Sequence, residues 1–164
     1  MSSIEHLQTF RPEVIFAEPV GSCTDISATV LGPLLECFDR YRVAPFTVLV
    51  DPARAAALQA ADADADMAFL FEKQLHEADL VCITKADIYP DAAAIPGVVA
   101  GTPGVSTRRL SARTGQGVQQ WLDEILLGSQ QAGRTTLEID YARYAQAEAC
   151  LLYTSLHSCA PRRS

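Results

Sequence analysis

A short apolar run at residues 81–83 is followed by Thr84-Lys85-Ala86-Asp87. Three of these four residues have polar or charged side chains that could bind a ligand. Two residues of that run are β-branched, so it is typical of the end of a buried parallel strand. Open α/β sheets bind ligands beyond the carboxyl ends of their strands. There, a carboxylate can accept two hydrogen bonds, and lysine offers an aliphatic stem as well as a charge. The tetrad therefore predicts a ligand site, and the simpler alternative is a surface turn after a strand.

A second acidic residue, Glu18, follows an apolar run at residues 14–17 and stands three positions before Gly21. The run predicts another strand. A carboxylate at a strand end can hold magnesium, usually through water, and the N–H of a glycine three residues later can meet a phosphate. Pro19 removes only its own N–H, so the N–H of Gly21 remains. The alternative for Glu18 is an acid at a strand end that faces water.

The loop after Gly21 carries hydroxyl and carboxylate groups on Ser22, Thr24 and Asp25. These groups could help to place a magnesium ion or a water molecule. Thr24 or Asp25 is also expected to cap the next helix, which the glycine and proline at residues 32–33 should kink. The apolar stripe of that helix predicts ordinary core packing and consists of Ile26, Val30, Leu34 and Phe38.

Strand and helix signals alternate through the rest of the chain. Residues 46–50 predict a buried strand, and the following Asp51-Pro52 is typical of a helix start. Residues 54–75 favour helix, and the Ala-Asp alternation at residues 61–66 is either a solvated helix surface or a loop between two helices. A last strand is expected near residues 105–110. This alternation predicts an α/β domain with a mostly parallel sheet.

Ser111 and Ala112 begin a third turn, in which Gly115 and Gly117 lead into a helix. The apolar face predicts that this helix packs on the sheet; its residues are Val118, Trp121, Leu122, Ile125 and Leu126.

Composition limits the classes of partner. The 164 residues allow one domain, and a net charge of -7 with a pI near 4.8 argues against general binding of nucleic acid or anionic membranes. No apolar run approaches a membrane span and no leader peptide is evident, so we expect a cytoplasmic protein. The five cysteines have no metal-site spacing and are expected to be reduced thiols.

Three motifs in order resemble those of GTPases of the CobW/HypB/UreG family. Glu18-x-x-Gly21 resembles the end of the Walker-B strand, and residues 84–87 resemble the guanine-specificity motif, which is usually Asn-Lys-x-Asp. Ser111-Ala112 resembles the fifth GTPase motif. Residues 137–149 favour the CobW branch, and the resemblance covers residues 10–150. It implies a P-loop NTPase-type three-layer α/β sandwich.

The resemblance also implies how a guanine base would be read. Asp87 would accept hydrogen bonds from the ring N–H and the exocyclic amine, a pattern that adenine does not offer. Lys85 would lay its stem along the purine, and Thr84 would tie this loop to the phosphate-binding loop. A backbone N–H of the turn at Ser111 and Ala112 would bind the guanine O6.

On the phosphate side, the resemblance implies GTP hydrolysis with Mg²⁺, with Glu18 and Gly21 as catalytic residues and Glu18 as the magnesium residue. It also places the family's nucleotide-responsive switch at the loop that carries Ser22, Thr24 and Asp25. Family members deliver a metal to a client protein or insert one in cobalamin-related chemistry. Zinc, cobalt or nickel would be the transported metal, and a homodimer is possible.

The sequence departs from the family in one major respect. The phosphate-binding Gly-x-x-x-x-Gly-Lys-Ser/Thr is absent, and only seventeen residues precede Glu18. We therefore expect an N-terminally truncated GTPase domain at residues 1–128, a linker and the start of a further segment at 129–151, and a non-native tail at 152–164. The parent would be a GTPase, whereas this chain should neither hydrolyse GTP nor bind it with useful affinity. The alternative is a nucleotide-independent α/β interaction module without a phosphate site.

Overall fold

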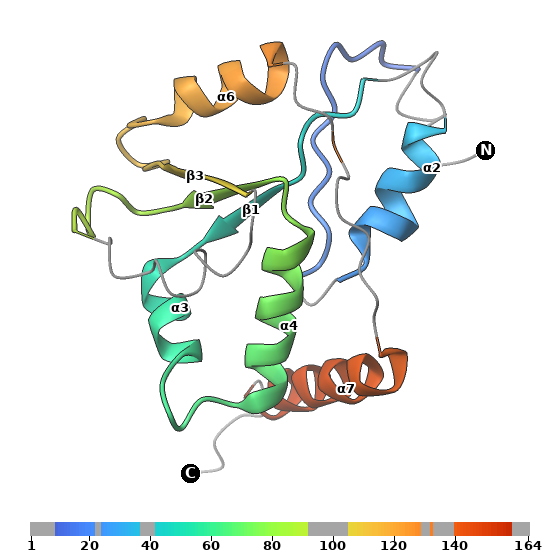
Figure 1. Cartoon of the computed structure of the whole chain (residues 1–164), viewed down its shortest axis with the longest axis vertical. Helices are drawn as coiled ribbons and strands as arrows, with labels where there is room; N and C mark the ends of the chain where they lie inside the picture. The colour runs from blue at the N-terminus through green and yellow to red at the C-terminus, as the bar shows by residue number, and fades with distance from the viewer. Residues whose placement is uncertain are drawn as a thin grey trace.

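The computed structural model describes residues 9–21, 24–36, 42–91, 105–128, 132 and 140–158, with side chains described as far as residue 149. Its centre is a three-stranded parallel sheet in the order β1(Thr47–Val50), β2(Leu80–Ile83), β3(Ser106–Arg109) (Figure 1). β1 and β3 lie within the ranges expected from the sequence, and β2 begins one residue before the apolar run at residues 81–83. The chain is therefore an α/β fold with a small, all-parallel sheet.

Helices cover both faces of this sheet. α3(Pro52–Leu58) and α4(Ala65–Glu77) lie on one face, and α6(Val118–Leu127) lies on the other (Figure 1). The central strand β2 is apolar and buried at all four positions because it has a strand on each side and helices above and below.

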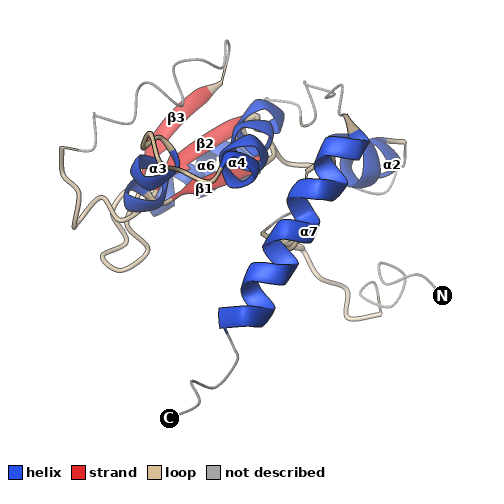
Figure 2. Cartoon of the chain, turned by 90° about the horizontal axis from the view of Figure 1, so that it is seen from below, coloured by secondary structure: helices blue, strands red, loops and turns tan. Residues whose placement is uncertain are grey.

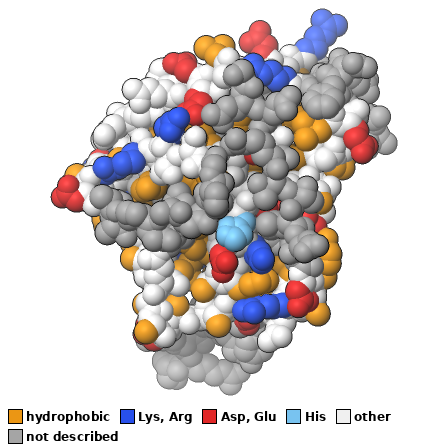
Figure 3. All heavy atoms as spheres, in the orientation of Figure 1, with side chains coloured by type: hydrophobic (Ala, Val, Ile, Leu, Met, Phe, Trp, Pro, Cys, Tyr) orange, Lys and Arg blue, Asp and Glu red, His pale blue; other side chains and the backbone are white. Residues whose placement is uncertain are grey.

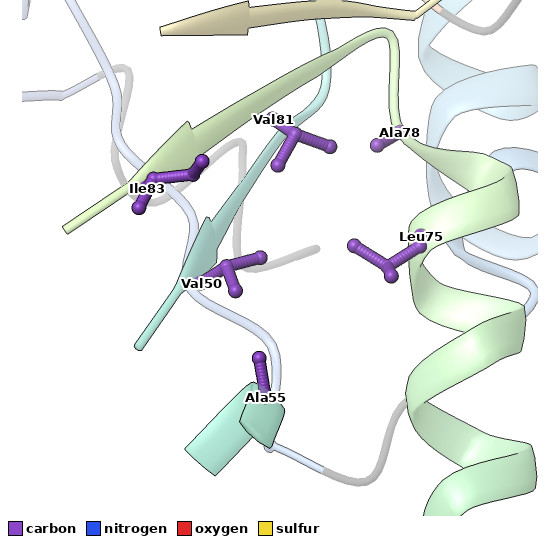
Figure 4. Close-up of a cluster of buried hydrophobic side chains, with 6 residues drawn as sticks. All are labelled: Val50, Ala55, Leu75, Ala78, Val81 and Ile83. Atoms are coloured by element: carbon purple, nitrogen blue, oxygen red, sulfur yellow. The ribbon is translucent and has the colours of Figure 1, made fainter. Parts of the chain in front are cut away.

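The first core cluster fills the space between the sheet and helices α3 and α4. Side chains from β1 and β2 point toward Ala55 of α3 and Leu75 of α4 (Figure 4). Each large apolar side chain buried in this way contributes roughly 1.5–3 kcal/mol to folding. The cluster consists of Val50, Ala55, Leu75, Ala78, Val81 and Ile83.

The second core cluster lies on the α6 face, where Leu80 and Cys82 of β2 meet Leu110 and Ile125. Alternate residues of a strand point to opposite faces, so the four residues of β2 divide between the two clusters. Cys82 is a free thiol, as expected, and burial raises its pKa to about 12. The other cysteines lie outside the described side chains.

Local signals explain where the helices begin. Asp51 caps α3 by accepting a hydrogen bond from the N–H of Ala53. Asp64 caps α4 through the N–H groups of Asp66 and Met67. The Ala-Asp alternation is thus mostly the connection between two helices, which is one of the two alternatives that the sequence left open.

The strand expected at residues 14–17 is not formed. This segment has no regular secondary structure and no strand partner among the described residues, and Val14, Ile15 and Phe16 are exposed. A strand persists only when a neighbour completes its hydrogen bonds, and the described sheet starts at β1. Glu18 therefore does not stand at a strand end.

The helix expected after Asp25 is present in a different form. A π-helix, η1(Ser27–Leu31), continues into α2(Gly32–Leu35), with the change at the predicted kink. The expected side-chain cap from Thr24 or Asp25 is absent, and Ile26 is the N-cap. A long-range acceptor replaces the local one, because the Ser27 N–H donates to Glu77 of α4. Phe38 lies outside the described residues.

A long helix, α7(Tyr141–Ser158), packs against α4 near the lower end of α4 in Figure 1 and stands apart from the sheet in Figure 2. It includes part of the segment expected to be a non-native tail. In the part of the chain that the structure describes, no helix is both long and apolar enough to cross a membrane.

Candidate functional site

The three parallel strands end at the same edge of the sheet. Val50, Ile83 and Arg109 are aligned in register, so the loops after the three strands leave side by side. This alignment places Asp51, residues 84–87 and the turn at Ser111 next to one another. Backbone bonds reinforce it, since Leu110 N–H donates to Ile83 and Ala86 N–H donates to Leu110.

A short hydrogen bond joins two of the predicted motifs. The Ser111 hydroxyl donates to Asp87 Oδ1 over 2.6 Å, although the two residues are 24 positions apart. Ser111 is fully buried and Asp87 is exposed, so a buried hydroxyl holds a carboxylate that faces outward. This hydrogen bond, with a smaller contribution from Arg113, lowers the pKa of Asp87.

Hydrogen bonds within the turn fix the conformation around Ser111. The Ser111 N–H donates to the Gln116 carbonyl, the Ser111 carbonyl accepts from Gly115, and the Ser111 hydroxyl accepts from Thr114 N–H. The Ser111 N–H is thus occupied within the turn. Of the two predicted O6 donors, Ala112 is the one that this arrangement favours.

Thr84 ties its loop to β1 instead of to a phosphate-binding loop. Its N–H and its hydroxyl both donate to the Val50 carbonyl, over 2.8 and 3.0 Å. These two bonds hold the beginning of the tetrad against the end of the neighbouring strand.

Lys85 makes an ion pair that the sequence did not suggest. Its ammonium lies 2.7 Å from Asp51 Oδ2, which raises the pKa of Lys85 and lowers that of Asp51. Its backbone is left-handed, with φ 56°. The available signal was positional: Asp51 directly follows β1 just as Thr84 directly follows β2. Sequence analysis treated Asp51 only as a helix start.

The structure does not bring the remaining predicted site residues to this edge. Glu18 is exposed in a segment without regular secondary structure, and the Gly21 carbonyl accepts a hydrogen bond from Gln74 of α4. No described contact joins Glu18 to Asp87 or to Ser111. Ser22 lies outside the described residues.

Thr24 and Asp25 instead belong to a buried polar cluster. Asp25 Oδ2 accepts a 2.6 Å hydrogen bond from the Tyr141 hydroxyl, and Glu77 Oε1 accepts the Ser27 N–H over 3.2 Å. Sequence analysis missed Glu77 and Tyr141. Glu77 stands seven residues after the buried Leu70, on the same helix face, and this spacing was the signal that it would be buried.

Burial has the largest effect on the pKa of Glu77. Desolvation raises its pKa and the charge of Asp25 adds to the rise, whereas backbone N–H groups of residues 25–27 oppose it. Among the described residues, three buried oxygen atoms near this point have no hydrogen-bond partner: Thr24 Oγ1, Ser27 Oγ and Glu77 Oε2.

The described residues offer little to a metal ion. They contain no group of three or more histidine, cysteine or acidic side chains placed to hold one. Magnesium coordination at Glu18 thus gains no support from the geometry. On the face drawn in Figure 3, basic side chains are scattered among acidic ones and form no basic patch.

Comparisons of the chain with models of protein families, with curated proteins and with solved structures find no match.

Proposed function

We propose that the strand-end edge at Asp87 and Ser111 is a guanine-reading site, part of a P-loop-type GTP-binding domain of the CobW-like kind. The hydrogen bond from Ser111 to Asp87 carries this proposal. It couples the motif that would read the base with the motif that would bind O6, and it favours the ionised form of the exposed carboxylate. An ionised carboxylate accepts the N–H and amine of guanine but repels the ring nitrogen of adenine.

The other contacts support a base site more than a phosphate site. Thr84 and Asp51 hold the loop against β1, and Lys85 lies over the same edge, where its stem could contact a purine face. Base contacts alone bind weakly because a nucleotide's charge is carried by its phosphates. We therefore keep the expectation that this chain neither binds GTP tightly nor hydrolyses it.

The wider role follows the resemblance. The parent protein would hydrolyse GTP with magnesium and pass zinc, cobalt or nickel to a client protein or a cobalamin-related cofactor. The exposed position of Glu18 favours the second candidate, a nucleotide-independent interaction module. Base-selective binding at the Asp87 edge distinguishes the GTP-binding domain from the interaction module.

The test is a nuclear magnetic resonance titration of the whole chain with guanosine and adenosine monophosphates. Both ligands carry the same phosphate, so their difference reports the base. We expect GMP at millimolar concentration to shift the backbone amides of residues 84–87 and 110–114, and AMP to leave them in place. Ser111→Ala should weaken the GMP response several-fold, because Asp87 loses the hydroxyl that orients it.

Ser106→Ala is the matched control, since it removes a hydroxyl from β3 away from the Asp87 carboxylate. Equal shifts with GMP and AMP, or no shift with either, would favour the interaction module and reject base reading.

A further inference from the structure

Residues 24–27 form a buried, mostly polar loop, named here the latch. Side chains from other helices hold its conformation. Thr24, Asp25 and Ser27 are only 6–7% exposed, although all three are polar. One holding contact comes from Glu77, 50 positions away, and the other from Tyr141, 116 positions away. In Figure 1, α4 carries the first anchor and α7 carries the second. The local sequence alone therefore does not determine this conformation.

Several unfavourable features are concentrated in the latch. Asp25 has φ 61°, a left-handed backbone that is unfavourable for residues with a Cβ, although less so for aspartate than for most. The hydroxyls of Thr24 and Ser27 and one oxygen of Glu77 are buried without partners. The charges of Asp25 and Glu77 also repel each other. Each of these features would be relieved if the loop opened to water.

The features that hold the latch closed are few and specific. The Tyr141 hydroxyl bonds the Asp25 carboxylate, backbone N–H groups surround the Glu77 carboxylate, and Ile26 is buried at 6% exposure. Strained backbone and orphaned polar groups persist only where the surrounding structure compensates for them.

We propose that the latch is a two-state element: closed when Tyr141 and Glu77 hold it, and open when Asp25 leaves Tyr141 and exposes Thr24 and Asp25 to solvent. Its position links two parts of the molecule. The carbonyl of Gly21, three residues before the latch, accepts a hydrogen bond from the Gln74 side chain of α4. Glu77 lies in the same last turn of α4, three residues before β2, whose loop carries Asp87. This proposal concerns the loop alone and does not depend on what binds at Asp87.

Hydrogen–deuterium exchange of the whole chain, followed by mass spectrometry, tests the proposal. Tyr141→Phe removes one hydroxyl from a ring that is 65% exposed, so it leaves the packing of α7 in place. We expect amide exchange in residues 26–36 to become about fivefold faster or more, because a hydrogen bond to a carboxylate is lost. Residues 80–83 of β2 should exchange as in the wild type.

Glu77→Gln should act in the opposite direction. The amide keeps an oxygen for the Ser27 N–H, offers an N–H to the orphaned hydroxyls and removes the repulsion with Asp25. Exchange in residues 26–36 should therefore become slower. Opposite effects of two mild substitutions are not expected of ordinary packing contacts.

Arg143→Ala is the matched control on α7. It removes the contact of Arg143 with the Phe69 ring of α4, 4.4 Å from the ring centre, without touching Asp25. The proposal requires unchanged exchange in residues 26–36 in this variant. It is overturned if Arg143→Ala accelerates exchange as much as Tyr141→Phe, if Tyr141→Phe has no effect, or if Glu77→Gln also accelerates it.

Discussion

The surroundings of Asp87 and Glu77 shift the pKa values of these two carboxyl groups in opposite directions. Asp87 is exposed and its pKa is lowered by the Ser111 hydroxyl, which suits a group that must stay charged to accept hydrogen bonds. Glu77 is fully buried and its pKa is raised by desolvation, which favours its protonated form. Motif and spacing indicated a base-reading role for Asp87, which stays a prediction. Spacing along α4 could indicate that Glu77 is buried, but it could not reveal that its partner is the Ser27 N–H, 50 positions away.

The raised pKa of Glu77 predicts how stability depends on pH. A carboxyl with a raised pKa binds its proton more tightly in the folded state, so it favours folding fully below the ordinary value of 4.5. This contribution is lost as the pH rises through the folded-state pKa. Glu77→Gln does not titrate. The free energy of unfolding of the variant minus that of the wild type should therefore increase from pH 4 upward and then level off.

Urea unfolding of both proteins between pH 4 and 8 measures this difference. A difference that stays constant with pH would mean that folding leaves the pKa of Glu77 unchanged. A difference that falls would mean that a favourable partner for the charged carboxylate outweighs its burial.

Among the elements, those with local signals were predicted well and those that need a distant neighbour were not. β2 is apolar at every position and α3 begins at an Asp-Pro pair, so composition and capping indicated both. The apolar run at residues 14–17 has equal strand propensity, but propensity cannot supply the neighbouring strand. The π-helix η1 likewise depends on Glu77, which lies on another helix.

The turn between β3 and α6 offers a sharp prediction at this scale. Gly115 and Gly117 both have positive φ, of 80° and 73°. A Cβ on Gly117 would lie 2.2 Å from the Arg109 carbonyl oxygen, whereas a Cβ on Gly115 would meet nothing within 4 Å. Gly115→Ala should cost about 1 kcal/mol of stability from backbone strain alone. Gly117→Ala should cost at least about 2 kcal/mol more, because backbone must move.

Urea unfolding of the two variants and the wild type checks this prediction. Equal costs would show that β3 and α6 can separate without penalty, and the turn would then be a poor support for Ser111.

At the scale of the whole molecule, the candidate site is a product of strand order. Register places the ends of β1, β2 and β3 together, so Asp51, Asp87 and Ser111 meet although 60 positions separate the first from the last. The sequence signals for a parallel α/β sheet were enough to predict that Asp87 and Ser111 lie at the same edge of the sheet. It could not predict that Lys85 pairs with Asp51, because side-chain pairing across strands depends on the exact register.

The phosphate half of the expected site shows the limit of motif reasoning. Glu18 and Gly21 match a motif in sequence, but that motif works only at the end of a strand inside the sheet. The segment that contains them lies outside the described sheet. The proposed function therefore depends on the residues of the base-reading edge alone.

The measurement that tests this account most directly is a change of base preference on Asp87→Asn. Asparagine offers an amine where the carboxylate accepted, and xanthine offers a carbonyl where guanine has its amine, so the pair is complementary again. Titration with GMP and xanthosine monophosphate should show a wild type that prefers GMP and a variant that prefers the xanthine nucleotide. Asp62→Asn, an exposed substitution in the connection between α3 and α4, should keep the wild-type preference. If Asp87→Asn still prefers GMP by the wild-type margin, Asp87 does not read the base and the proposed function is wrong.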